Sequence, residues 1–138
     1  MSKVIGFNNA IFWTDDTGIL YCEFSSSSPN LKLEKQNIEL YINAIKTLCN
    51  GKPMPFLIDL KDIRGTFSVA AANLVTNNPE IVKLRITESY LVNTVRMKLW
   101  LACYKRLYDR ITPFATFSDI TSAKNYCLEA RSRFYKSA

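Results

Sequence analysis

Two aspartates and the polar residues that follow them are the side chains in this sequence whose types and spacing could do chemistry. Asp59 and Asp62 lie at the end of an apolar run, and Arg64, Thr66 and Ser68 come directly after them. Two neighbouring carboxylates can act as acid and base or hold Mg²⁺. With the arginine and the hydroxyls they could also line a polar site for a partner protein or a small anion. The simpler interpretation is that Asp59 accepts hydrogen bonds from loop N–H groups and that Asp62 is solvated.

The composition narrows the possible chemistry. None of the 138 residues is histidine, which excludes Ser-His-Asp and Cys-His nucleophile pairs, histidine-ligated zinc or haem, and acid–base catalysis by imidazole. The sequence also lacks a glycine-rich phosphate loop and a G-x-S-x-G elbow. We therefore expect a protein that is not an enzyme and uses no cofactor and no metal.

Cysteine usage and hydropathy bear on the compartment. The sequence has no C-x-x-C pair, no targeting segment and no apolar run long enough to span a membrane. Its cysteines fall in apolar-periodic segments, so we expect buried free thiols in a reducing cytoplasm. These cysteines are Cys22, Cys49, Cys103 and Cys127.

The net charge of +6 is concentrated in the second half of the chain. Residues 1–80 hold 7 basic and 8 acidic side chains, whereas residues 81–138 hold 11 basic and 4 acidic ones. A solvated basic exterior is the simpler interpretation, and a surface for phosphate or nucleic acid is the alternative. No helix-turn-helix or stacking-sheet motif accompanies the charge, so nucleic acid is an unlikely partner. The cations that could follow a phosphate backbone are Arg96, Lys98, Lys105, Arg106 and Arg110.

Strands and helices alternate along the chain, which is typical of an α/β domain. Apolar and aromatic runs around an Asp/Gly turn predict a β-hairpin at the start. Helical periodicity, caps and short apolar runs predict the remaining elements. They are strands at 10–13 and 19–24, a helix within 33–50, a strand at 55–60, a small helix from Ser68, a helical turn opened by Pro79, a strand at 85–92, a helix over 94–110, a strand at 112–117 and a last helix capped by Ser118.

The order of these elements predicts one domain over residues 1–138, with its core at 10–135. Right-handed βαβ crossovers make the centre of a mixed sheet parallel, with the hairpin as its antiparallel edge. About five strands and four to five helices are expected.

Three local features accompany this order. The first is the turn from Gly51 into a buried strand that ends in Asp59, and the second is Arg64-Gly65-Thr66-Phe67-Ser68 before an alanine-rich helix. The third is Phe114-Ala115-Thr116-Phe117-Ser118-Asp119 before a helix that contains Ala123. Together they resemble the STAS superfamily, with its SpoIIAA-like (anti-sigma-factor antagonist) fold, and more narrowly the small stand-alone STAS-like proteins of bacteria that have no known function.

The resemblance implies a candidate phosphorylation site. In the antagonists a partner kinase phosphorylates a serine at the start of the helix after the central strand, which corresponds to Ser68. A phosphate at a helix N-terminus is favoured by free N–H groups and the helix dipole. The antagonists have Asp-Ser-Ser-Gly where this chain has Phe67-Ser68-Val69-Ala70. The alternative is that Ser68 only caps the helix.

The helix predicted over 94–110 is apolar on two sides. Leu99 and Cys103 lie outside its main apolar arc, next to Arg96 and Arg106, so these four residues are a candidate interface for a homodimer or another protein. The aromatic residues nearby could be ordinary core, or they could line a cavity between this helix and the sheet. They are Tyr90, Trp100, Tyr104 and Tyr108.

We expect a cytoplasmic, non-enzymatic regulatory or protein-interaction module of the STAS-like class. Its partner would be another protein, such as a regulator of the kinase type, or a second copy of the chain. Docking is expected where the strand ends at Asp59 and the loop from Arg64 to Ser68 follows. The alternatives are a carrier or sensor of a small apolar, lipid-like ligand and, third, weak binding of nucleic acid or phosphate by the basic half.

Overall fold

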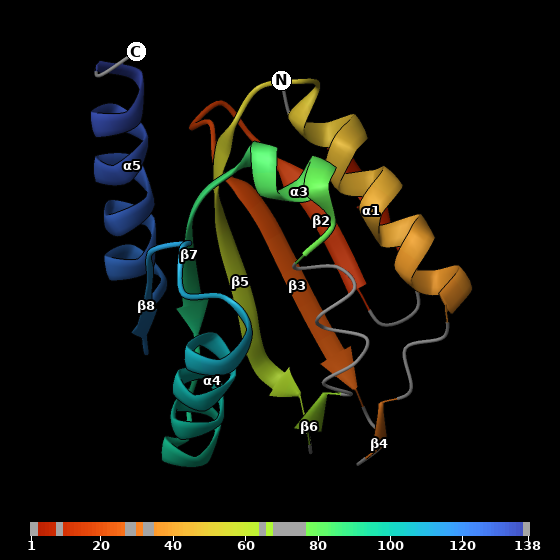
Figure 1. Cartoon of the computed structure of the whole chain (residues 1–138), viewed down its shortest axis with the longest axis vertical. Helices are drawn as coiled ribbons and strands as arrows, with labels where there is room; N and C mark the ends of the chain where they lie inside the picture. The colour runs from red at the N-terminus through yellow and green to blue at the C-terminus, as the bar shows by residue number, and fades with distance from the viewer. Residues whose placement is uncertain are drawn as a thin grey trace.

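A six-stranded mixed sheet forms the centre of the protein (Figure 1). The computed structural model describes residues 3–7, 10–26, 30–31, 35–63, 66–67 and 77–136. The sheet has the order β1-β2-β3-β5-β7-β8, and β4 pairs with β6 beside it. The strands are β1 (Lys3–Gly6), β2 (Ala10–Thr14), β3 (Leu20–Ser26), β4 (Asn30–Leu31), β5 (Met54–Ile63), β6 (Thr66–Phe67), β7 (Arg85–Leu91) and β8 (Phe114–Phe117). The described helices are α1 (Lys35–Cys49), α3 (Pro79–Leu84), α4 (Val95–Tyr108) and α5 (Ile120–Lys136).

The pairing confirms the predicted fold class. β3, β5, β7 and β8 are parallel neighbours, while β1, β2 and β3 are antiparallel. The main sheet has one strand more than expected, because Lys3–Gly6 pairs with β2 and takes the edge that was predicted for the hairpin. The four residues of β1 are too few to show a strand pattern without their partner.

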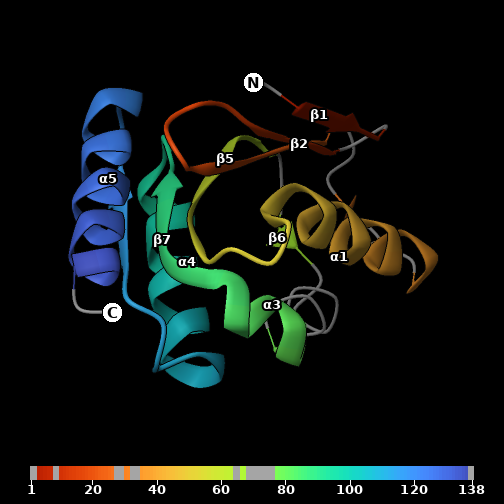
Figure 2. The ribbon, with the colours of Figure 1, turned by 90° about the horizontal axis from the view of Figure 1, so that it is seen from above.

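The helices are divided unequally between the two faces of the sheet. Phe56 of β5 packs in the cluster of α1, whereas the next residue, Leu57, packs with Ala123 and Cys127 of α5. Ile58 contacts both the α1 cluster and the α4 cluster. Because side chains alternate along a strand, α1, α3 and α4 lie on one face and α5 lies on the other (Figure 2).

Helix starts follow the sequence signals closely. Pro79 opens α3 after Asn78, whose side chain accepts hydrogen bonds from the N–H groups of Glu80 and Ile81. At the start of α4, the Thr94 hydroxyl accepts a hydrogen bond from the Met97 N–H. The start of α5 differs from the prediction, because Asp119, not Ser118, accepts the Ser122 N–H at 2.8 Å. Both residues are good N-caps, so the sequence alone did not separate them.

Candidate functional site

The strand-end site predicted from the sequence is described only in part. Asp59 lies in β5, and its carboxylate accepts the Lys61 N–H at 3.0 Å, which is the local role that the simpler interpretation gives it. Asp62 and Thr66 are placed only as members of β5 and β6, and Arg64 and Ser68 lie outside the described residues. The docking and phosphorylation roles of this region stay predictions. Among the described residues, no group of three or more acidic or cysteine side chains could hold a metal ion.

The candidate interface residues of the 94–110 segment lie together on the solvent side of α4. Arg96, Leu99, Cys103 and Arg106 are all exposed, and Leu99 has 63% of its surface accessible. Buried residues of the same helix, among them Met97 and Leu101, fall on the opposite side. Cys103 therefore departs from the expectation of four buried thiols, while the other three cysteines are buried.

This surface continues beyond the four predicted residues. Val95 and Leu107 are exposed at either end of α4, and Ile111, just after the helix, is 92% exposed. The charged side chains exposed along α4 and directly after it are all basic. We call this surface the α4 outer face; its residues are Val95, Arg96, Leu99, Cys103, Arg106, Leu107, Arg110 and Ile111.

A hollow of about 570 Å³ adjoins the C-terminal end of the α4 outer face. Arg106 and Arg110 line it together with Thr112 and the ring of Phe114, which begins β8. The Arg110 Nε donates to the Arg106 carbonyl at 2.9 Å. The hollow thus has two arginines at its exposed rim.

A buried ion cluster lies at the floor of this hollow and joins α4 to β7. Lys105, only 1% exposed, donates to Glu88 and, at 2.7 Å, to Asp109. Asp109 also accepts a hydrogen bond from Arg85 Nη2 at 3.2 Å. The Tyr90 hydroxyl donates a hydrogen bond to the Glu88 carboxylate at 2.8 Å. Two cations thus face two carboxylates, and the four side chains are almost completely buried.

The surroundings of the cluster shift the pKa of Asp109 and of Tyr90. Burial alone would raise the pKa of Asp109, but hydrogen bonds from Lys105 and the Thr112 N–H, and the charges of Lys105 and Arg85, lower it below its ordinary value. Burial, followed by the charge of Glu88, raises the pKa of Tyr90 well above its ordinary value. Tyr90 therefore stays a neutral donor, and the bases in the cluster are already occupied by partners.

The location of Lys105 corrects the expectation of five solvent-facing cations on this helix. Its side chain faces β7 and is not available to a phosphate backbone. The signal was present in the sequence, because position 105 follows Met97 and Leu101 at offsets of 8 and 4, on the same helical side. Sequence reasoning missed it because a lone lysine is normally solvated.

The aromatic residues near α4 pack against one another and against the core. Trp100 and Tyr104 stack on each other at 5.4 Å between ring centroids, and Tyr104 contacts Tyr108 at 5.2 Å. The interior between α4 and the sheet is filled by a cluster that includes Leu60, Tyr90, Met97 and Leu101. The core interpretation of these aromatics therefore fits better than that of a lined cavity.

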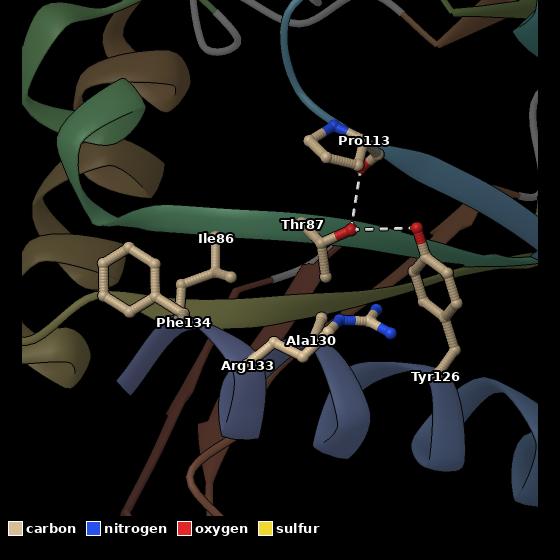
Figure 3. A pocket seen from close by; sticks show the side chains of 7 residues that line it. All are labelled: Ile86, Thr87, Pro113, Tyr126, Ala130, Arg133 and Phe134. Carbon is tan, nitrogen blue, oxygen red and sulfur yellow. Dashed lines mark hydrogen bonds between the residues drawn. The ribbon is translucent and has the colours of Figure 1, made fainter. Parts of the chain in front are cut away.

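A second hollow, of about 480 Å³, lies on the opposite face of the sheet, between α5 and the start of β7 (Figure 3). The sequence does not indicate it, because Ala130 and Phe134 continue the apolar periodicity of Ala123 and Cys127, a pattern typical of core positions. In the structure Ala123 and Cys127 are fully buried, whereas Phe134 is 42% exposed.

Comparison with known proteins places the chain in a family. The model of a domain of unknown function, DUF7793, matches residues 12–131. The chain belongs to this family. No curated protein matches the sequence, so the family assignment brings no biochemical role with it.

The fold is also found in a solved structure. The chain is similar to an uncharacterised protein of the DUF3478 family with a SpoIIAA-like fold from Shewanella loihica PV-4, with a TM-score of 0.58, 14% identity and 92% of each chain covered. This confirms the SpoIIAA-like fold inferred from the sequence. At such low identity the likeness concerns the fold alone. No helix in the described part of the chain is long and apolar enough to cross a membrane.

Proposed function

We propose that the protein is a non-enzymatic interaction module that binds a partner protein through the α4 outer face. The observation that carries the proposal is the row of exposed Val95, Leu99, Leu107 and Ile111 set among exposed arginines. Contiguous apolar surface with a charged rim is typical of protein interfaces. The buried acids and bases of the ion cluster are paired with one another, which favours binding over catalysis.

The chemistry of this surface favours an acidic amphipathic helix as the partner element. The apolar row follows a helix of 14 residues, about 21 Å long, which matches the ridge-and-groove packing of a second helix. Arginines on both sides of the row would pair with carboxylates on that helix. A second copy of α4 fits less well, because the like charges of two such faces would repel each other.

The hollow beside Arg106 and Arg110 gives the surface an anchoring point. A carboxylate side chain of the partner could enter it and meet either guanidinium. Pockets that receive one buried side chain commonly provide most of the binding energy of an interface. A cytoplasmic location is proposed together with this function, since the four cysteines are free thiols.

Fluorescence anisotropy with designed peptides tests the proposal. The probe is a labelled helical peptide with leucines at i, i+3, i+4 and i+7 and glutamates elsewhere; its twin has lysines in place of the glutamates. We expect the acidic peptide to bind and the basic one not to. Leu99→Ser should weaken binding about tenfold or more, since it removes one buried leucine from the contact. The double variant Arg106→Glu/Arg110→Glu should abolish it.

Matched controls lie away from α4. Leu40→Ser on α1 changes a leucine of similar exposure, and Lys52→Glu/Lys83→Glu makes the same change of charge away from α4. Both should bind like the unmodified protein. The proposal is wrong if Leu99→Ser binds unchanged or if the basic peptide binds equally well. It is also wrong if vesicles of phosphatidylglycerol or a single-stranded RNA bind through Leu99 and Arg106 while the acidic peptide does not.

A further inference from the structure

The hollow at the C-terminal end of α4 is bordered by two arginines, Arg106 and Arg110. The buried ion cluster at its floor is balanced, since it contains two cations and two carboxylates. The two arginines are additional to that balance, and neither guanidinium forms an ion pair with a described residue. The rim of the hollow therefore carries two positive charges that are open to a ligand.

The second of these arginines is held in place before any partner arrives. It belongs to a turn that Asp109 fixes, since the Asp109 carboxylate accepts hydrogen bonds from the N–H groups of Ile111 and Thr112. The Arg110 Nε donates to the Arg106 carbonyl at 2.9 Å, and the terminal nitrogens of Arg110 form no hydrogen bond with the described residues. A side chain that is already ordered loses less conformational entropy on binding.

The backbone at the end of α4 is also adapted to an anion. The C-terminal end of a helix normally repels negative charge, because its last carbonyls have no partner within the helix. Two of these carbonyls have partners here. The Asp109 N–H donates to the Lys105 carbonyl at 3.0 Å, and Arg110 donates to the Arg106 carbonyl. The repulsion is thereby reduced at the rim of the hollow.

The number of open charges favours one class of anion. A carboxylate compensates one arginine, whereas a phosphorylated serine carries a charge of roughly −1.5 to −2 at pH 7 and has three acceptor oxygens. Arginine forks bind phosphate in two-pronged contacts. A phosphate monoester therefore matches the two arginines in charge and in the number of acceptors.

The position of the arginines favours a short side chain as the carrier of the phosphate. Both arginines are exposed at the rim, whereas the floor is formed by the buried side chains of Lys105 and Asp109. A longer phosphotyrosine would bring its phosphate toward the floor, where the cations are already paired. The hollow adjoins the α4 outer face, so a helix that lies on the apolar row can bring one of its own side chains to the rim.

We propose that this hollow binds a phosphoserine of the partner helix, so that phosphorylation of the partner strengthens its docking on α4. The inference rests on the protein-binding function proposed for the α4 outer face and names the group that the hollow recognises. Arg106 and Arg110 both contact the phosphate. A carboxylate at the same position of the partner is a weaker ligand for the same two arginines.

Fluorescence anisotropy with matched peptides tests the inference. The parent is the acidic helical peptide with leucines at i, i+3, i+4 and i+7. Serine, glutamate, phosphoserine or phosphotyrosine is placed at one position just beyond the leucine row. We expect phosphoserine to bind about tenfold more tightly than glutamate, because it adds charge-assisted contacts to a second arginine. Phosphotyrosine should gain less than phosphoserine.

Two sets of controls locate the phosphate. The same four residues are placed at the opposite end of the peptide, and the gain from phosphoserine should be larger at one end than at the other. That larger gain should be mostly lost in Arg106→Gln and in Arg110→Gln. It should be unchanged in Arg96→Gln, which removes an exposed arginine near the start of α4. Circular dichroism verifies that each variant is folded.

The pH supplies a readout that a purely structural role of the arginines would not produce. The second pKa of phosphoserine is about 6, so its tenfold advantage over glutamate at about pH 7.5 should fall to about threefold or less at pH 5. The chain contains no histidine, so no imidazole titrates in this range. The glutamate peptide, measured at both pH values, corrects for changes in the protein itself. The charged groups at the hollow are Arg85, Glu88, Lys105, Arg106, Asp109 and Arg110.

The outcomes separate this inference from the proposed function. If the phosphoserine and glutamate peptides bind equally and both lose affinity in Leu99→Ser, the phosphoserine site is wrong and the protein-binding face is retained. If no acidic peptide binds through Leu99, both fail. The inference is also overturned if the gain survives in both arginine variants, if Arg96→Gln removes it, or if phosphotyrosine binds more tightly than phosphoserine. Displacement of the phosphopeptide by an equal concentration of inorganic phosphate would indicate a site for the free ion and would reject the inference.

Discussion

Replacing Lys105 with methionine should test whether the ion cluster between α4 and β7 contributes to stability as its geometry implies. The ammonium group is 1% exposed and bonded to two carboxylates. Methionine matches the length of the stem but leaves Glu88 buried with only the Tyr90 phenol as a partner. Removing one member of a buried ion pair typically costs about 3–5 kcal/mol, a large part of the roughly 5–15 kcal/mol that stabilises a domain. We expect Lys105→Met to lose about that amount.

The double variant Lys105→Met/Glu88→Gln should be more stable than the single one. Glutamine can still accept from Tyr90, and no uncompensated charge remains at this position. Asp109 keeps Arg85 and the N–H of Thr112. A coupling of about 2 kcal/mol between the two sites is expected for residues in direct contact. Lys98→Met is the control, because Lys98 is exposed on the same helix, and its effect should stay within about 0.5 kcal/mol.

The pH dependence supplies a second readout. In the unmodified protein the lowered pKa of Asp109 contributes stability above its unfolded-state pKa, and that stability is lost as the pH falls through the folded-state value. Lys105→Met removes one of the groups that lower this pKa. The part of the loss of stability that comes through Asp109 should therefore be full at about pH 7 and should shrink as the pH falls below about 4.

Urea unfolding followed by the fluorescence of the two tryptophans, Trp13 and Trp100, measures these differences. The reasoning is refuted if Lys105→Met costs no more than Lys98→Met. It is also refuted if the double variant is less stable than Lys105→Met, or if the loss at about pH 3 is no smaller than the loss at about pH 7.

Three further predictions follow from local geometry. Thr94→Ala removes the acceptor at the start of α4 and should cost about 1 kcal/mol in chemical denaturation. Gly18→Ala should lower the thermal midpoint, with a cost of about 1–2 kcal/mol, because Gly18 has a φ of +82° and an added methyl group would collide with Arg131; a midpoint equal to that of the unmodified protein would contradict this. A thiol reagent should modify only Cys103 in the folded protein, and modification of a second cysteine without unfolding would disprove the burial. The protected thiols are Cys22, Cys49 and Cys127. Burial raises the pKa of all three, to about 12 for Cys49 and Cys127.

The sequence predicted most of the fold, because its elements have strong local signals. The periodicity of α1, the caps of α3 and α4, and the continuous apolar run of β5 each identify one element without reference to the others. Their order then implied parallel pairing at the centre of the sheet. β1 could not be predicted in the same way, since its four residues form a strand only through pairing with β2. The small helix expected from Ser68 lies outside the described residues.

The functional surfaces were less predictable, because they depend on how far each helix approaches the sheet. Leu99 and Cys103 could be assigned to the exposed side of α4 from their angular position. The same reasoning places Phe134 on the side of Ala123 and Cys127, yet Phe134 is 42% exposed. Helical periodicity gives the side of the helix on which a residue lies, but not how much of the sheet lies opposite it.

The ion cluster also sets the rotation of α4 about its own axis. A purely apolar side of a helix can turn by a fraction of a residue with little loss, whereas Lys105 and the C-cap residue Asp109 have to meet Glu88 and Arg85 of β7. A turn of one residue position, about 100°, would bring Arg106 toward Glu88 and swing Leu99 away from the centre of the exposed side. The ion pairs between α4 and β7 therefore determine which arginines and leucines the protein presents to its surroundings. Substitutions deep in β7 could redirect that surface without altering any residue on it.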